Sequence, residues 1–195
     1  MSGFTADERE RIDTALREAG RELFARYGLS KTTIADLTGE VGIAAGTFYQ
    51  FYDSKEALYL AVLDDEGEAV AAAVVPPLED GDPEAGLREF LGRLCDEIET
   101  NPLVANLLTG GALDRLRRTM TSEERERDRQ ESLAYIIPFV ERWQAAGRLP
   151  EADPAVVAGA VRAATFITLH QEDLGDRYPE IRSVFLDAFA AGLVD

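Results

Sequence analysis

The chain has 195 residues, 46% of them hydrophobic, and a formal net charge of −17 at pH 7. It contains no apolar run long enough for a membrane helix and starts with an acidic stretch rather than a signal peptide, so we expect no membrane association. The single cysteine, Cys95, excludes an internal disulfide, which is typical of a cytoplasmic protein.

The first expected element is an amphipathic helix over about residues 6–27. Ile12, Leu16, Leu23 and Tyr27 recur at helical spacing and form one apolar stripe. Gly28 follows where a helix C-cap should stand.

Two short helices joined by a tight turn are predicted over residues 32–51, TTIADLTGEVGIAAGTFYQF. Thr32 or Thr33 can cap the first helix, and Gly42 permits the sharp turn. The second helix, about residues 44–51, is too short to be stable alone and must be held by its aromatic side chains. Its other face is small and polar, which is typical of the reading helix of a helix-turn-helix, although an ordinary helical hairpin has the same spacing.

A further helix is expected from Lys55, after an Asp53 or Ser54 cap, to about Val75. With it, the segment ELFARYGLSKTTIADLTGEVGIAAGTFYQFYDSKEALYLAVL resembles the DNA-binding domain of the tetracycline-repressor-like (TetR) family of bacterial transcription regulators. The resemblance covers about residues 9–69. It implies a transcription regulator, expected to be a repressor that a small-molecule effector releases from its operator.

The remainder of the chain predicts helices only, which gives an all-α fold of about nine helices. We expect a three-helix DNA-binding domain over residues 9–69 and a helical effector-binding and dimerisation domain over residues 70–195. Proline or glycine stands at most of the expected helix ends. Pro138 predicts a kink within a long helix that ends near residue 146.

The resemblance and the residue chemistry together predict the DNA contacts. Hydroxyls, an amide and an ammonium can hold phosphates, Gly46 permits close approach, Gln50 can bond adenine, and the two alanines leave only apolar contact. The predicted DNA-binding residues are Thr32, Thr33, Ala44, Ala45, Gly46, Thr47, Tyr49, Gln50 and Lys55.

The charge distribution opposes DNA binding. Residues 1–60 hold seven basic and ten acidic side chains, a net −3, where a DNA-binding domain usually carries a basic face. The chain's two lysines, Lys31 and Lys55, nevertheless bracket the helix-turn-helix. We therefore expect few phosphate contacts and a shallow salt dependence of DNA binding.

The last two expected helices, about residues 154–173 and 179–194, are apolar and rich in small residues. Such helices need cover on every side, and the resemblance implies a homodimer formed through them. The reading helices of the two copies would then bind a palindromic operator in double-stranded DNA, with half-sites about one helical turn apart.

An effector pocket is expected among inner-facing side chains of the second domain. The candidates are Phe90, Leu94, Leu107, Tyr135, Phe139, Trp143, Phe166 and His170. One histidine makes no metal site, and neither a catalytic triad nor a phosphate-binding loop is present, so we expect no metal, no cofactor and no enzyme activity. The alternative function is a ligand-binding or protein-interaction module whose helix-turn-helix is weakened.

Overall fold

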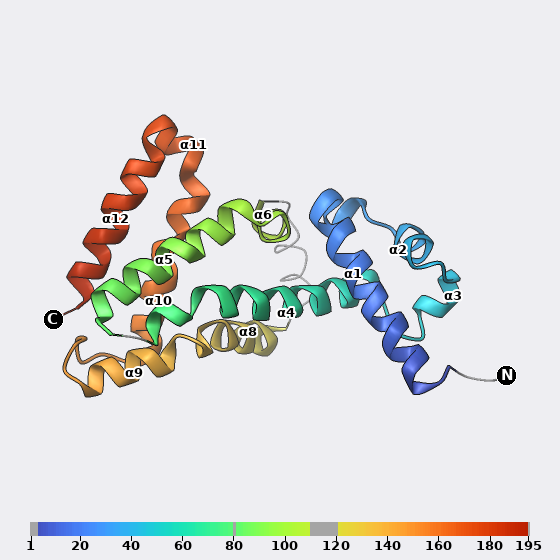
Figure 1. The fold of residues 1–195 in the computed structure, drawn as a ribbon, viewed down its shortest axis with the longest axis horizontal. Coiled ribbons are helices and arrows are strands. Elements are labelled where there is room, and N and C mark those ends of the chain that lie inside the picture. Colours follow the sequence, from blue (N-terminus) through green and yellow to red (C-terminus); the bar gives the residue numbers. More distant parts are fainter. Residues whose placement is uncertain (1–3, 80, 110–120, 195) are drawn as a thin grey trace. The chain divides into compact units, whose positions relative to one another are not determined.

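The computed structural model describes residues 4–79, 81–109 and 121–194, and within these ranges the regular structure is helical with no strand. The expected all-α fold is therefore confirmed (Figure 1). The described residues form two compact units. Unit one is built from the chain up to Glu68 together with the segment that begins at Asn101, and unit two holds Ala69–Thr100 and the chain from Thr121 onward.

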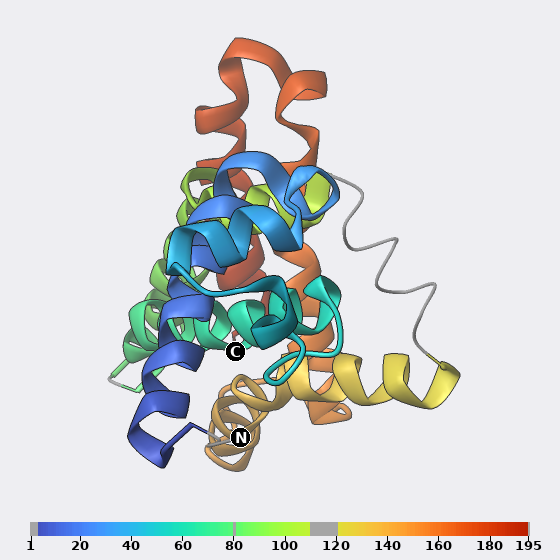
Figure 2. The ribbon, with the colours of Figure 1, turned by 90° about the vertical axis from the view of Figure 1, so that its right-hand side faces the viewer.

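Unit one contains α1 (Ala6–Lys31), α2 (Ile34–Val41), α3 (Ala45–Phe48), most of α4 (Lys55–Val74) and α6 (Pro102–Thr109). In Figure 2, α2 and α3 lie in front of α1. The expected break after the first helix is present, because Gly28 has φ 72° and ψ 165° and interrupts α1. Gly42 ends α2 in the left-handed conformation at φ 74°, as a turn of this kind requires.

The core of unit one joins all five of its helices. Leu16, Phe24, Leu37, Phe48 and Tyr59 have no exposed surface, and Leu103 of α6 is buried in the same cluster. Burying such side chains stabilises the fold by roughly 1.5–3 kcal/mol each. The core thus fixes α2 and α3 against α1 and α4, and α6 closes it.

Two asparagine amides attach α6 to the rest of unit one. Asn101 caps α6 with its carbonyl oxygen, 3.1 Å from the Leu103 amide nitrogen, and donates its side-chain amide to Glu66 at 2.5 Å. Asn106 donates to the carbonyl oxygen of Ala25 at 2.5 Å, near the break at Gly28. From the sequence, α6 is expected in the C-terminal domain over residues 70–195, whereas it packs within unit one.

Unit two begins inside α4, between Glu68 and Ala69, one residue before the boundary expected from the sequence. Its elements are η1 (Pro76–Leu78), α5 (Pro83–Thr100), α8 (Ser122–Ala134), α9 (Ile137–Ala145), α10 (Pro154–Ala164), η2 (Thr165–His170), α11 (Gln171–Leu174), η3 (Gly175–Arg177) and α12 (Tyr178–Leu193). Phe90, Leu91, Val140, Trp143 and Val161 lie in its core. No helix in the described ranges combines the length and apolar character needed to cross a bilayer.

Two expected long helices are divided in unit two. The helix expected to kink at Pro138 instead splits into α8 and α9, with Pro138 in the first turn of α9, where a missing N–H costs nothing. The helix expected over residues 154–173 ends at Ala164 and continues as the 3-10 segment η2, whose TFITLH sequence includes β-branched residues that disfavour an α-helix.

Candidate nucleic-acid interface

The second helix of the helix-turn-helix is a single turn. α3 covers Ala45–Phe48, whereas the sequence predicts a helix over residues 44–51. Its N-cap residue, Ala44, supplies no side-chain hydrogen bond. The chain keeps turning beyond α3, since the Tyr52 amide donates to the Phe48 carbonyl at 3.1 Å. A helix this short depends on tertiary support for its position.

Phe48 provides the main apolar anchor of α3. Its side chain is fully buried in the core of unit one, together with Leu37 and Leu58. The Phe48 ring meets the Tyr49 ring edge-on, at 5.6 Å between centroids, and lies 6.0 Å from the Tyr52 ring. Edge-to-face contacts of this kind add to the energy of burial. The back of the reading helix is therefore fixed by aromatic packing, as the sequence predicts.

The opposite face of α3 is open and low in relief. Ala44, Ala45, Gly46 and Gln50 are exposed, and Tyr49 has 57% of its surface exposed. No atom lies within 4 Å of the place where a Cβ on Gly46 would stand. Thr47, between these residues, is partly buried. Six of the nine predicted DNA-binding residues thus lie on or beside α3, on a surface that a duplex could approach closely.

The two threonines before α2 have different roles. Thr33 is exposed and caps α2: its hydroxyl donates to Asp36 at 2.6 Å and accepts from the Asp36 amide at 3.2 Å. The Thr33 hydroxyl, and then its backbone N–H, lowers the pKa of the Asp36 carboxyl. Thr32 is buried, and its hydroxyl donates to the carbonyl of Gly28 at 2.9 Å. The structure therefore does not bring Thr32 to the surface that carries the other predicted residues.

Lys55 is tied to the chain before α2. Its ammonium donates to the carbonyl oxygens of Leu29 and Thr32, each at 2.7 Å. These carbonyls are left open where α1 ends, so Lys55 acts as a cap from another helix. Two of its three N–H donors are used in this way. The phosphate contact expected of Lys55 stays a prediction.

Residues of α1 that were not predicted from the sequence contact the chain just after the reading helix. Arg9 donates to the carbonyl of Gln50 at 3.2 Å, and its guanidinium lies 4.9 Å from the centre of the Phe51 ring. The hydroxyl of Tyr52 donates to Asp13 at 2.6 Å. The only signal in the sequence is the four-residue spacing of Arg9 and Asp13, which places them on one face of α1 but names no partner.

The predicted effector residues do not gather around one site. Phe90 and Trp143 are buried in the core of unit two, and Leu94, Tyr135 and Phe139 pack partly buried against it. Phe166 and His170 are exposed, and the His170 ring lies 3.0 Å from Asp173. Leu107 lies in α6 and packs against the core of unit one, so it is not part of the domain to which the sequence assigned it.

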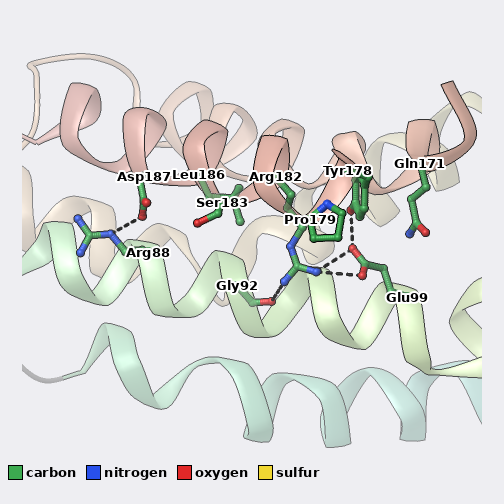
Figure 3. Close-up of a pocket in the computed structure, with 10 residues that line it drawn as sticks. All are labelled: Arg88, Gly92, Glu99, Gln171, Tyr178, Pro179, Arg182, Ser183, Leu186 and Asp187. Carbon is green, nitrogen blue, oxygen red and sulfur yellow. Dashed lines mark hydrogen bonds and ion pairs between the residues drawn. The ribbon is translucent and has the colours of Figure 1, made fainter. Parts of the chain in front are cut away.

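Unit two contains a cavity of about 600 Å³ between α5 and α12, which none of these residues lines. Arg182 crosses it, donating to Glu99 at 2.9 Å and to the Gly92 carbonyl at 3.1 Å (Figure 3). Burial, reinforced by Glu99, raises the pKa of Tyr178, whose hydroxyl donates to the same carboxylate. At the other end, Arg88 pairs with Asp187 at 2.8 Å. Each of these charged side chains is therefore paired, and the rest of the cavity wall is mainly apolar.

Sequence similarity to known proteins lies in the first unit. The family model described as bacterial regulatory proteins, tetR family, matches residues 16–62. A curated relative, the uncharacterized HTH-type transcriptional regulator YerO of Bacillus subtilis (strain 168), is 41% identical over 59 residues, which are 30% of this chain. The aligned part is 19% of that relative's length.

Solved structures resemble nearly the whole chain. A TetR-family transcriptional regulator from Pectobacterium atrosepticum is 18% identical, with a TM-score of 0.73 over 98% of both chains. RolR, solved in complex with resorcinol, is 22% identical, with a TM-score of 0.67 over 97% of this chain and 90% of RolR. At this level of identity the likeness concerns the fold.

Proposed function

The chain belongs to the tetR family of bacterial regulatory proteins, and from this premise we propose that it is a homodimeric, DNA-binding transcription regulator. It acts as a repressor that a small molecule releases from a palindromic operator in double-stranded DNA. The proposed DNA contacts come from Thr33, the exposed face of α3 and Lys55.

The observation that carries this proposal is the asymmetry of α3. One side is anchored through Phe48, which has no exposed surface. The other side presents Ala44, Ala45 and Gly46, all exposed, with nothing within 4 Å of the place of a Cβ on Gly46. A short helix with a fixed back and a low front can enter the major groove and bring its backbone near the bases.

Dimer formation is supported by apolar side chains exposed on both of the expected interface stretches. Val156, Phe166 and Leu169 are 65%, 51% and 49% exposed, and Val184 of α12 is 68% exposed. Exposed large apolar side chains that recur on neighbouring turns mark an interaction surface. A second copy of the chain would cover them and pair two readers by twofold symmetry.

Release by an effector needs a ligand that prefers one conformation of the dimer over another. The cavity between α5 and α12, at about 600 Å³, has the size of a small-molecule site. RolR binds resorcinol, and by analogy we place the effector of this protein in unit two.

The test is selection of DNA by the full-length protein from a pool of randomised duplexes, followed by gel shift of the recovered sequence. Gly46→Arg should abolish the shift, since its side chain would project into the open space in front of α3 and hold the helix away from the bases. Its melting temperature should stay near that of the wild type.

The matched control is Gly39→Arg, on α2, where a side chain also meets nothing within 4 Å. It adds the same charge and should leave a gel shift in place. Recovery of no enriched duplex by the wild type would overturn the proposal. That outcome would favour a ligand-binding or protein-interaction module, for which the absence of polar groups at Ala44 and Ala45 is the supporting feature.

A further inference from the structure

One face of α1 carries a row of polar side chains that reaches the flank of the reading helix. Arg9, Asp13 and Arg17 are spaced by four residues and so share this face. Each of them contacts a residue at least 39 positions away in the chain, apart from the bond between Asp13 and Arg17 themselves. Together they join the end of α3 to α4 through α1.

The centre of this row is Asp13. One of its carboxylate oxygens accepts from the Tyr52 hydroxyl at 2.6 Å, and the other accepts from the Arg17 Nε at 3.1 Å. Arg17 is in turn fixed on α4, where it donates to Asp65 at 2.9 Å and to the carbonyl of Ala61 at 3.2 Å. Arg17 therefore holds the Asp13 carboxylate in one orientation, and that carboxylate in turn fixes the position of the Tyr52 hydroxyl.

The reading helix has few supports of its own. α3 has four residues and no side-chain cap, so its orientation depends on neighbouring contacts: Phe48 in the core, Arg9 at the Gln50 carbonyl and Tyr52 at Asp13. Of these, the Tyr52 hydrogen bond has a partner, Asp13, that is itself bonded to Arg17 and through it to α4. The Tyr52 hydroxyl is also partly buried, and its burial, reinforced by Asp13, raises its pKa, so that it remains a hydrogen-bond donor.

We propose that Asp13 is a positioning residue for DNA recognition, which sets the orientation of α3 through the Tyr52 hydroxyl and is itself oriented by Arg17. This inference rests on the proposed DNA-binding function. It runs against simple electrostatics, because a carboxylate near a DNA-binding surface repels phosphate and its removal should tighten binding. A positioning role therefore predicts that loss of the Asp13 carboxylate weakens DNA binding, whereas charge repulsion alone predicts that it tightens binding.

The test compares four variants of the full-length chain on the duplex that the wild type selects from a randomised pool. Asp13→Ala and Tyr52→Phe should each weaken binding by roughly tenfold, since the competent orientation of α3 becomes a minor population. Asp13→Asn keeps one acceptor for the Tyr52 hydroxyl but turns a donor toward Arg17, and should recover part of the affinity lost in Asp13→Ala. The double variant of Asp13→Ala and Tyr52→Phe should be no weaker than Asp13→Ala alone, because that substitution already removes the hydrogen bond from Tyr52.

The charge control is Glu10→Ala, an exposed site on α1 that removes the same charge. It should leave the affinity unchanged or slightly higher. The slope of affinity against salt should be the same in every variant, because no phosphate contact is removed. If Asp13→Ala tightens binding as Glu10→Ala does, the positioning role is wrong.

A readout without DNA separates this inference from the proposed function. The amides of Phe51 and Tyr52 donate to the Phe48 carbonyl at 2.9 and 3.1 Å. Hydrogen exchange at these amides should be faster in Asp13→Ala and Tyr52→Phe, while exchange in the centre of α1 stays as in the wild type. Unchanged exchange would overturn the inference even if DNA is bound, and faster exchange would support it even if no duplex is selected.

Discussion

A single hydroxyl in the core of unit one is left without a partner among the described residues. Tyr59 has no exposed surface, and its ring meets Phe24 edge-on at 4.9 Å. Its oxygen has no hydrogen bond, and burial raises its pKa to about 12. A polar group buried in this way lowers the free energy of unfolding, because it loses water without replacement.

Tyr59→Phe should therefore stabilise the protein by about 1–2 kcal/mol, since it removes the unpaired oxygen and keeps the ring. The measurement is the free energy of unfolding from denaturant titration. Tyr49→Phe is the matched control: Tyr49 is exposed, so loss of its hydroxyl should change stability by less than about 0.5 kcal/mol. A destabilised Tyr59→Phe would reveal a partner for the hydroxyl.

At the scale of the elements, helix ends were predictable because their signals are local. Gly28, Gly42 and the Asn101–Pro102 pair mark helix ends in the sequence and in the structure alike. The failures are breaks inside expected long helices. The split before Pro138 and the 3-10 segment after Ala164 interrupt apolar patterns that continue beyond them in the sequence.

The candidate interface divides in the same way. The exposed face of α3 and the anchor Phe48 follow from residue type and helical spacing. Two other features depend on residues 23 to 39 positions apart in the chain: the hydrogen bonds from Lys55 to two carbonyls and the hydrogen bond from Tyr52 to Asp13. Periodicity carries no information about such pairs, so the sequence placed these side chains on elements without giving their partners.

The contact between η1 and α5 provides a test of packing between elements. A Cβ on Gly86 would lie 2.6 Å from the carbonyl oxygen of Pro77, which is too close for any side chain. Gly86→Ala should lower the free energy of unfolding by about 1–3 kcal/mol, because the backbone must move.

The control for this prediction lies on the same helix. A Cβ on Gly92 meets no atom within 4 Å. Gly92→Ala should therefore stabilise α5 by up to about 1 kcal/mol, through helix propensity alone. Thermal unfolding of both variants measures the difference, and equal effects of the two substitutions would contradict the close packing of Gly86 against η1.

At the scale of the whole molecule, two surface properties concern different partners. The net charge of −17 concerns DNA. The exposed apolar side chains of α10, η2 and α12 concern a second copy of the chain. Beside α3, the two arginines of the α1 row, Arg9 and Arg17, are bonded to a carbonyl and to carboxylates, which leaves less positive charge there for phosphate. The apolar surfaces need a cover that a single copy does not supply.

Val184→Lys should weaken dimer formation by roughly thirtyfold or more, since twofold symmetry places the new charge in the interface twice. Light scattering over a dilution series measures the dissociation constant. Asp176→Asn makes the same change in charge at an exposed site between the two apolar stretches and should leave the dimer intact. A Val184→Lys variant that stays dimeric to the same dilution would place the interface elsewhere.

The position of α6 in unit one has a consequence for synthesis on the ribosome. The core around Phe24 and Tyr59 includes Leu103, and the amides of Asn101 and Asn106 complete the bonds of Glu66 and Ala25. These residues are translated only after all of α5, which belongs to unit two. The core of unit one therefore cannot be completed until α5 of unit two has been translated. A chain terminated before α6 would carry a DNA-binding unit whose core lacks Leu103.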